Sequence, residues 1–290
     1  MPQYKKIKVI INPAAGKDEP IINILNDVFY NHGVEWDVSL THKFGDATEL
    51  AQAAAASGDY DLVTAYGGDG TQMEIANGMK SSGVPMAILP GGTGNAMAFE
   101  LNVPRDLRQA AELICTSEKL QTVDLAKAND TYFMLRLYSG VEESQKTSRE
   151  QKDSYGILAY PLSLVEMGLD LNHAQYKLKI DGETIEESGV ACFIVNAGSI
   201  GGVDLSFDQK IDVSDGLLDV FMINTSISSL GSAAGRFLNL KSGEAYHSWR
   251  GQEIVMEADP PQTIWVDGEL LGSTPLTISS VPGALQIVVP

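Results

Sequence analysis

The stretch LVTAYGGDGT, residues 62–71, decides which fold we expect for the N-terminal half of the chain. Its first five residues are an apolar run typical of a buried strand, and residues 71–79 have a helical pattern. The glycines between them let a ligand approach the backbone and tolerate positive φ. The N–H groups that open a helix attract anions. A strand, a glycine turn and a helix in this order predict an anion-binding turn.

Asp69 lies within this turn, where its charge would repel a bare phosphate. A Mg²⁺ ion between the carboxylate and the phosphates would resolve that conflict, because hard cations prefer oxygen ligands. A tight turn in which Asp69 caps the following helix explains the same residues. The turn alone leaves both interpretations open.

Two more turns of small residues follow strand-like runs. Residues 90–95, PGGTGN, come after an apolar run at 84–89, and residues 12–17, NPAAGK, come after residues 8–11. In a parallel sheet the carboxyl ends of the strands meet at one edge, so we expect the three turns to line one crevice. None of them has the spacing GxxxxGK[ST] or GxGxxG, which gives no support to a P-loop or a dinucleotide fingerprint.

The texture of the chain changes near residue 125. Up to that point strands alternate with helices, including residues 21–30 and 47–56, the latter with Asp46 as a plausible N-cap. We therefore expect an α/β domain with a parallel sheet over residues 1–125. Residues 126–290 contain short strands separated by the turns Asp181-Gly182, Asp215-Gly216 and Asp267-Gly268, with helical stretches at 155–167 and 229–238. This pattern predicts an antiparallel β-sandwich domain.

Composition excludes several classes of protein. Of the 290 residues, 20 are Lys or Arg and 38 are Asp or Glu, which gives a net charge of −18. So acidic a chain lacks the basic footprint of a nucleic-acid binder, and its electrostatic attraction to anionic membranes is weak. Cys115 and Cys192 lie in apolar stretches and suggest no disulfide framework. We expect a cytoplasmic protein.

Several motifs together resemble the diacylglycerol kinase catalytic-domain family, which includes bacterial soluble lipid kinases and sphingosine and ceramide kinases. The resemblance covers nearly the whole chain in order. The family implies a nucleotide-binding α/β domain, a β-sandwich domain and an active site between them. The motifs are NPAAGK at 12–17, Thr41 with GDA at 45–47, GGDGT at 67–71 with Glu74, ILPGGTGN at 88–95, SDGLLDV at 214–220 and VDGE at 266–269.

This resemblance also assigns a nucleotide site with ATP and Mg²⁺ as cofactors. Asp69 would reach Mg²⁺ through water. Glu74 would either support the site or simply suit the positive end of its helix. The residues that would hold ATP are Asn12, Gly16, Thr41, Gly67, Gly68, Asp69, Gly70, Thr71 and Thr93.

The late motif contributes two carboxylates. By resemblance, Asp267 would help organise Mg²⁺ and Glu269 would accept the proton of the substrate hydroxyl. If the chain stays extended there, the two side chains face the same side. The same tripeptide, Asp-Gly-Glu, also occurs at residues 181–183, where we expect a plain hairpin turn.

A second metal site is implied by resemblance to the bacterial branch. Asp215 would be a structural Mg²⁺ ligand, together with the carbonyl groups of Asp212 and Leu217. A plain surface turn is the alternative interpretation of this segment.

The leading hypothesis is an ATP- and Mg²⁺-dependent kinase that phosphorylates a hydroxyl group of diacylglycerol or a related lipid, with only transient membrane contact. NAD kinases also carry GGDGT and are one alternative. Another is a catalytically silent protein that binds nucleotide or lipid, since Met73 and Ala96 stand where the family often has Asn and Asp. The oligomeric state stays open, a homodimer included.

Overall fold

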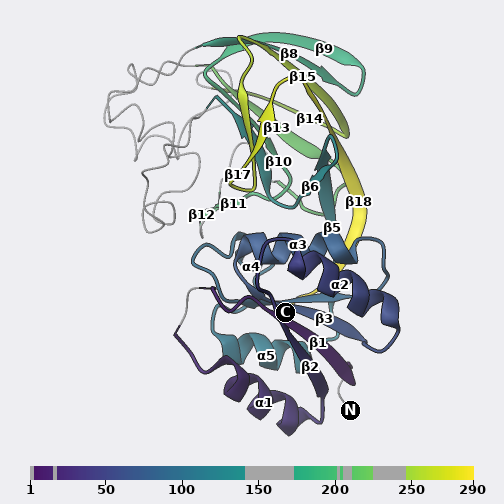
Figure 1. Ribbon diagram of the computed structural model, residues 1–290. Helices are drawn as coiled ribbons and strands as arrows, with labels where there is room; N and C mark the ends of the chain where they lie inside the picture. Colours follow the sequence, from purple (N-terminus) through teal and green to yellow (C-terminus); the bar gives the residue numbers. More distant parts are fainter. Residues whose placement is uncertain (1–2, 16–17, 141–172, 201–202, 205–210, 225–245) are drawn as a thin grey trace. The chain divides into compact units, whose positions relative to one another are not determined.

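The computed structural model describes residues 3–15, 18–140, 173–200, 203–204, 211–224 and 246–290 (Figure 1). In chain order we call residues 12–17 the first turn, residues 67–71 the second and residues 90–95 the third. Gly16 of the first turn lies outside the described residues, as do the helical stretches expected at 155–167 and 229–238. The chain divides into two compact units, residues 1–123 with 283–290 and residues 124–282. The last eight residues thus belong to the first unit, whereas we expected from the sequence that residues 126–290 form the second domain.

The first unit is built on a parallel sheet with the strand order β2-β1-β3-β4-β18. The final strand explains why the C-terminus returns to this unit, because its Ile287 pairs in parallel with Met86. The central strands β3 and β4 are buried along their whole length, as expected for parallel strands covered on both faces. The strands are β1 (Lys6–Ile11), β2 (Glu35–Leu40), β3 (Leu62–Gly67), β4 (Met86–Pro90) and β18 (Leu276–Val288).

Helices cover both faces of this sheet (Figure 1). Helix α1 (Ile21–His32) packs on α5 (Leu107–Thr116) on one face, and α2 (Asp46–Ser57) packs on α3 (Asp69–Met79) on the other. The short helix α4 (Ala96–Glu100) follows the third glycine turn. None of the helices in the described part of the chain is long and apolar enough to cross a membrane.

The start of α2 differs from the prediction. Gly45, with φ of 93°, is the N-cap, and Asp46 is the first helical residue. The carboxylate of Asp46 instead accepts hydrogen bonds from the backbone N–H groups of His42 and Lys43, at 2.8 and 3.1 Å. These bonds, the one from His42 foremost, lower the pKa of Asp46. The acid therefore fixes the loop before the helix.

The second unit is an antiparallel β-sandwich. One sheet has six strands in the order β14-β13-β10-β7-β16-β17, and the facing strands are β8, β9, β15 and the first part of β18, with β5 and β6 beside them. Residues from both sheets, such as Ile194, Val220, Leu178 and Met256, form one buried cluster. The bounds are β5 (Leu120–Ala128), β6 (Thr131–Phe133), β7 (Arg136–Ser139), β8 (Ala174–Ile180), β9 (Glu183–Gly189), β10 (Ala191–Val195), β11 (Ser199–Ile200), β12 (Val203–Asp204), β13 (Leu218–Ile223), β14 (Tyr246–Gly251), β15 (Glu253–Asp259), β16 (Thr263–Val266) and β17 (Glu269–Ser273).

Two of the three Asp-Gly turns are hairpins as predicted. Asp181-Gly182 joins β8 to β9, and Asp267-Gly268 joins β16 to β17. Positive φ at both central residues matches the turn type that suits the twist of antiparallel strands. The prediction is wrong for Asp215-Gly216, because β13 pairs with β10 and β14. The expected fold class, a parallel α/β unit plus a β-sandwich, is confirmed.

Candidate functional site

Three glycine-rich or small-residue turns meet at the carboxyl edge of the parallel sheet. The N–H of Asn12, directly after β1, donates to the carbonyl of Tyr66 in β3 at 3.0 Å. The N–H of Gly91, directly after β4, donates to the carbonyl of Gly67 at 3.0 Å. The described parts of the three turns therefore lie side by side at one edge of the sheet, as expected. That all three line one crevice stays a prediction.

Close packing explains most of these glycines. A Cβ added to Gly92 would lie 2.5 Å from the Cα of Gly68, and one on Gly67 would lie 2.6 Å from the Cβ of Thr71. The expected positive φ is wrong for the second and third turns, since none of their glycines adopts it. At Gly92 a side chain does not fit because the second and third turns touch backbone to backbone, whereas at Gly67 the space is taken by the side chain of Thr71.

Gly70 is different from its neighbours. It is exposed, and a Cβ added to it would meet no atom of the described residues within 4 Å, apart from its chain neighbours and its own helix backbone. Its φ is not positive either. Neither packing nor backbone conformation therefore requires a glycine at this position, which leaves the surface above Gly70 open.

Helix α3 presents its N-terminus at the same place. Its N-cap is Gly68, which has no side chain with which to cap the helix. The first N–H groups of such a helix form an anion site when a ligand is present. Asp69, the first residue of the helix, accepts a hydrogen bond from the N–H of Met97 in α4 at 3.4 Å. Its carboxylate thus lies between the second and third turns.

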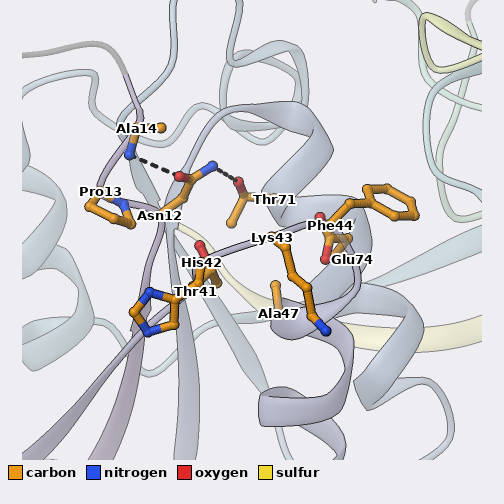
Figure 2. Close-up of a pocket in the computed structure, with 10 residues that line it drawn as sticks. All are labelled: Asn12, Pro13, Ala14, Thr41, His42, Lys43, Phe44, Ala47, Thr71 and Glu74. Atoms are coloured by element: carbon orange, nitrogen blue, oxygen red, sulfur yellow. Dashed lines mark hydrogen bonds between the residues drawn. The ribbon is translucent and has the colours of Figure 1, made fainter.

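Side chains join the first turn to the second (Figure 2). The Asn12 amide donates to the hydroxyl of Thr71 at 3.0 Å, and its carbonyl oxygen accepts the N–H of Ala14 at 3.0 Å. Thr71 is nearly buried, with 6% of its surface exposed. Asn12 therefore both shapes the first turn and ties it to α3.

A cavity of about 460 Å³ lies beside this link (Figure 2). It is lined in part by four of the residues that the sequence analysis assigned to the nucleotide site, namely Asn12, Thr41, Thr71 and Glu74. The N–H of Thr41 donates to the carbonyl of Ile11, which places the end of β2 next to the first turn. The other lining residues are Pro13, Ala14, His42, Lys43, Phe44 and Ala47.

Glu74 builds one wall of this cavity from α3. Its carboxylate accepts the N–H of Gly45 at 2.7 Å, and its backbone carbonyl accepts the hydroxyl of Thr48 at 2.9 Å. Gly45 has a left-handed conformation that its lack of a side chain permits. Glu74 therefore positions the start of α2, in addition to facing the cavity.

The third turn is held by a residue that we did not assign from the sequence. Asn95 is 2% exposed and has a φ of 49°. Its side chain accepts the N–H of Gly92 and donates to the carbonyl of the same residue. Asparagine tolerates this left-handed conformation, and its side chain readily forms hydrogen bonds with nearby backbone groups. An asparagine at the end of a glycine turn is the sequence signal that could have identified this role of Asn95. Thr93, assigned to ATP by resemblance, is exposed within this turn.

The late carboxylates belong to the second unit. Asp267 is the first central residue of the β16–β17 hairpin, and its carboxylate accepts N–H groups from Met134, Leu135 and Arg136 at 2.8–3.3 Å. Burial raises the pKa of this carboxyl, and the hydrogen bonds from the backbone oppose that shift. Asp267 thus fastens the hairpin to the start of β7.

Glu269 follows this turn as the first residue of β17 and is exposed. The condition under which Asp267 and Glu269 would face the same side, an extended chain, is not met, because the chain reverses at Asp267-Gly268. The Asp181 copy has the same design, and its carboxylate accepts the N–H groups of Gln252 and Glu253. Both aspartates therefore fix a hairpin to a neighbouring strand.

The segment proposed as a structural Mg²⁺ site does not fit a divalent cation. One oxygen of Asp215 accepts the N–H of Leu217 at 2.9 Å, and the other is paired with the guanidinium of Arg250. The same guanidinium lies 2.9 Å from the carboxylate of buried Asp219. The carboxylate of Asp212 accepts the N–H of Ser214. Arg250 thus supplies the positive charge that a metal would bring.

Comparisons with known proteins match both units. The diacylglycerol kinase catalytic domain matches residues 6–128, and the YegS C-terminal NAD kinase beta sandwich-like domain matches residues 136–289. A protein of Staphylococcus haemolyticus named "Putative lipid kinase SH2167" is 30% identical over 80% of this chain and 77% of its own length. An uncharacterized Synechocystis protein is 30% identical over 79% of this chain, which spans about half, 55%, of that relative.

Solved structures agree with these matches. The crystal structure of a "putative diacylglycerol kinase" from Bacillus anthracis has a TM-score of 0.87 and 28% identity, covering 99% of this chain and 97% of that one. The fold and these matches together indicate a kinase built from a glycine-turn α/β unit and a β-sandwich unit. The chain belongs to the diacylglycerol kinase catalytic-domain family.

Proposed function

We propose that this protein is an ATP- and Mg²⁺-dependent lipid kinase that transfers the terminal phosphate to a hydroxyl group of diacylglycerol or a related lipid. The observation that carries the proposal is the convergence of three turns with the N-terminus of α3 beside a cavity of about 460 Å³. The N–H groups that open a helix, and those of glycine-rich turns, are suited in general to the oxygens of a polyphosphate.

Gly70 supports a ligand at this place independently. Neither packing nor φ explains a glycine there, but a ligand that approaches the backbone closely does. The nucleotide is held in this proposal by Asn12, Thr41, Gly67, Gly68, Gly70, Thr71, Glu74 and Thr93, with Gly16 from outside the described residues.

Three carboxylates carry the chemical step in the proposal. Asp69, which accepts the N–H of Met97, would help to hold Mg²⁺ of the nucleotide complex, and the metal would offset the charge of the phosphates. Glu269 is exposed and accepts the proton of the lipid hydroxyl. The oxygen of that hydroxyl bonds to the terminal phosphorus as the bond from this phosphorus to ADP breaks and ADP leaves. Asp267 holds the hairpin that carries Glu269 and, by the family resemblance, would help to organise Mg²⁺.

The acceptor and its setting follow from the family. Relatives bear the names lipid kinase and diacylglycerol kinase. The net charge of −18 argues against tight electrostatic binding to anionic lipid, so membrane contact is transient in this proposal. Cys115 and Cys192 are buried free thiols, which suits a reducing cytoplasm.

The test is transfer of label from [γ-³²P]ATP to a panel of lipids in mixed micelles. We expect labelled diacylglycerol or a related lipid, a loss of 100-fold or more for Asp69→Asn, and a loss of about 10²–10⁴-fold for Glu269→Gln. Asp130→Asn is the matched control, because Asp130 is a fully exposed surface acid paired with Lys127.

Two outcomes would overturn the proposal. Phosphorylation of NAD in place of any lipid would favour the NAD kinase alternative, which the description of the second family model keeps in view. Tight binding of ATP without transfer to any acceptor would favour a silent regulator, the alternative that Met73 and Ala96 suggest.

A further inference from the structure

Tyr66 contacts all three turns although it belongs to none of the motifs assigned above. It is the residue before Gly67 at the end of β3, and its surface is 0% exposed. Its carbonyl oxygen accepts the N–H of Asn12 in the first turn at 3.0 Å. Its ring lies under the third turn, where a Cβ added to Gly91 would be 2.8 Å from the ring atom Cε1.

The hydroxyl of Tyr66 makes the third connection. It donates to Oε1 of Glu19 at 2.9 Å, a residue 47 positions earlier in the chain. Glu19 lies between the first turn and α1, two residues before Ile21, and its carbonyl accepts the N–H of Ile21 at 2.8 Å. Tyr66 therefore holds the chain on both sides of the first turn, at Asn12 where the turn begins and at Glu19 two residues after it.

Burial keeps this hydroxyl in its donor form. Desolvation foremost, and then the hydrogen bond to Glu19, raise the pKa of Tyr66 well above its ordinary value. The phenol therefore stays protonated over the whole pH range in which the protein would work, and the hydrogen bond to the carboxylate persists.

We propose that Tyr66 is a positioning residue of the nucleotide site, which holds the first and third turns at a fixed separation through Glu19 and Gly91. The proposal rests on the proposed function, because the turns are taken to cradle the phosphates. It adds a residue pair, Tyr66 and Glu19, that touches no phosphate itself. Its effect on ATP arises only through the shape of the cradle.

A purely structural role predicts something different. If Tyr66 only fills space beneath Gly91, its ring matters and its hydroxyl does not. Tyr66→Phe keeps the ring and removes only the hydroxyl, so it separates the two roles. Tyr60→Phe is the matched control, since Tyr60 also donates to a carboxylate, that of Asp37, at 2.9 Å, but at an exposed site on the far ends of the strands.

The experiment measures the Kd for ADP by calorimetry and the KM and kcat for ATP in the variants Tyr66→Phe, Glu19→Ala, Glu19→Gln and Tyr66→Phe/Glu19→Ala. We expect Tyr66→Phe and Glu19→Ala to raise the Kd and KM about fivefold, the factor for one net hydrogen bond, with kcat and Tm nearly unchanged. Glu19→Gln keeps an acceptor oxygen and should restore most of the affinity.

The double variant completes the test. Because both single changes break the same bond, it should weaken binding no further than either alone. Hydrogen exchange without nucleotide gives a second readout, in which peptides spanning residues 12–20 should exchange faster in Tyr66→Phe but not in Tyr60→Phe. If Tyr66→Phe does not fold, the comparison of Glu19→Ala with Glu19→Gln and wild type still decides.

Several results would overturn this inference. Unchanged affinity and exchange in Tyr66→Phe would show that the hydroxyl positions nothing. Additive losses in the double variant would show that Tyr66 and Glu19 act separately. A wild-type protein that binds no adenine nucleotide would overturn the proposed function and this inference together, and that result is recognised before any variant is made.

Discussion

Gly70→Ala is expected to change stability and nucleotide affinity in opposite directions. Its chain neighbours and own helix backbone aside, the added methyl group meets no atom within 4 Å in the part of the chain that the structure describes, and the backbone already has a conformation that alanine adopts. Gly70 lies in the first turn of α3, where alanine loses less backbone entropy on folding. The substitution should therefore stabilise the fold by about 0.5 kcal/mol and raise the Tm by about 1–2 °C.

Nucleotide binding should weaken at the same time. The methyl group would stand where we place the phosphates, and a hydrogen bond from the backbone to a charged oxygen would lengthen or break. Loss of one such bond costs about 1.5–3 kcal/mol, which corresponds to a Kd about 10–100-fold higher. Calorimetry with ADP and Mg²⁺, together with thermal unfolding of the same samples, measures both effects. Wild-type affinity in a stabilised Gly70→Ala protein would show that no ligand approaches this turn.

Three further changes test other parts of the structure. Gly92→Ala places a Cβ 2.5 Å from the Cα of Gly68, so the second and third turns must separate by about 1 Å. In steady-state assays kcat/KM for ATP should then fall about 100-fold. An unchanged kcat/KM would contradict the close contact between the turns. Asp267→Ala leaves three backbone N–H groups without their acceptor and should lower the free energy of unfolding, measured in urea, by about 3 kcal/mol. Asp181→Ala should lower it less, because the Asp181 carboxylate is more exposed. Equal losses would argue against a special role for the buried hydrogen bonds of Asp267. Burial raises the pKa of Asp219 to about 6, with Arg250 opposing the shift, so folding favours the protonated carboxyl and the stability that this provides below pH 4 is lost as the pH rises through 6, by up to about 3 kcal/mol. Asp219→Asn should remove this dependence when free energies of unfolding are compared from pH 4 to 8. Parallel profiles of the variant and the wild type would contradict it.

Local patterns made the α/β half of the fold predictable. Apolar runs ending in glycine turns locate β3 and β4, and the rule that parallel strands share a carboxyl edge brings the turns together before any contact is known. The same reasoning misjudged why the glycines are there. Sequence suggested positive φ, whereas Gly92 is required because it touches Gly68, a contact between segments 24 positions apart that no local pattern reveals.

Partners distant in sequence account for the other differences. Asp215 was compared with a metal ligand, but its charge is met by Arg250, which is 35 positions away and belongs to another strand. Tyr66 and Glu19 form a hydrogen bond that neither residue's neighbours predict. The return of residues 283–290 to the first unit likewise depends on one strand long enough to serve both units. Each is a tertiary interaction that overrides what the local sequence indicates.

The central claim is that the three turns bind the phosphates of one nucleotide. Amide hydrogen exchange, with and without a non-hydrolysable ATP analogue and Mg²⁺, tests it at the backbone groups concerned. We predict protection concentrated at Ala14 and Ala15, at residues 69–71 and at residues 92–94, with little change in the strands of the second unit. Protection confined to other segments, or no protection at saturating analogue, would contradict the assignment of a nucleotide to these turns.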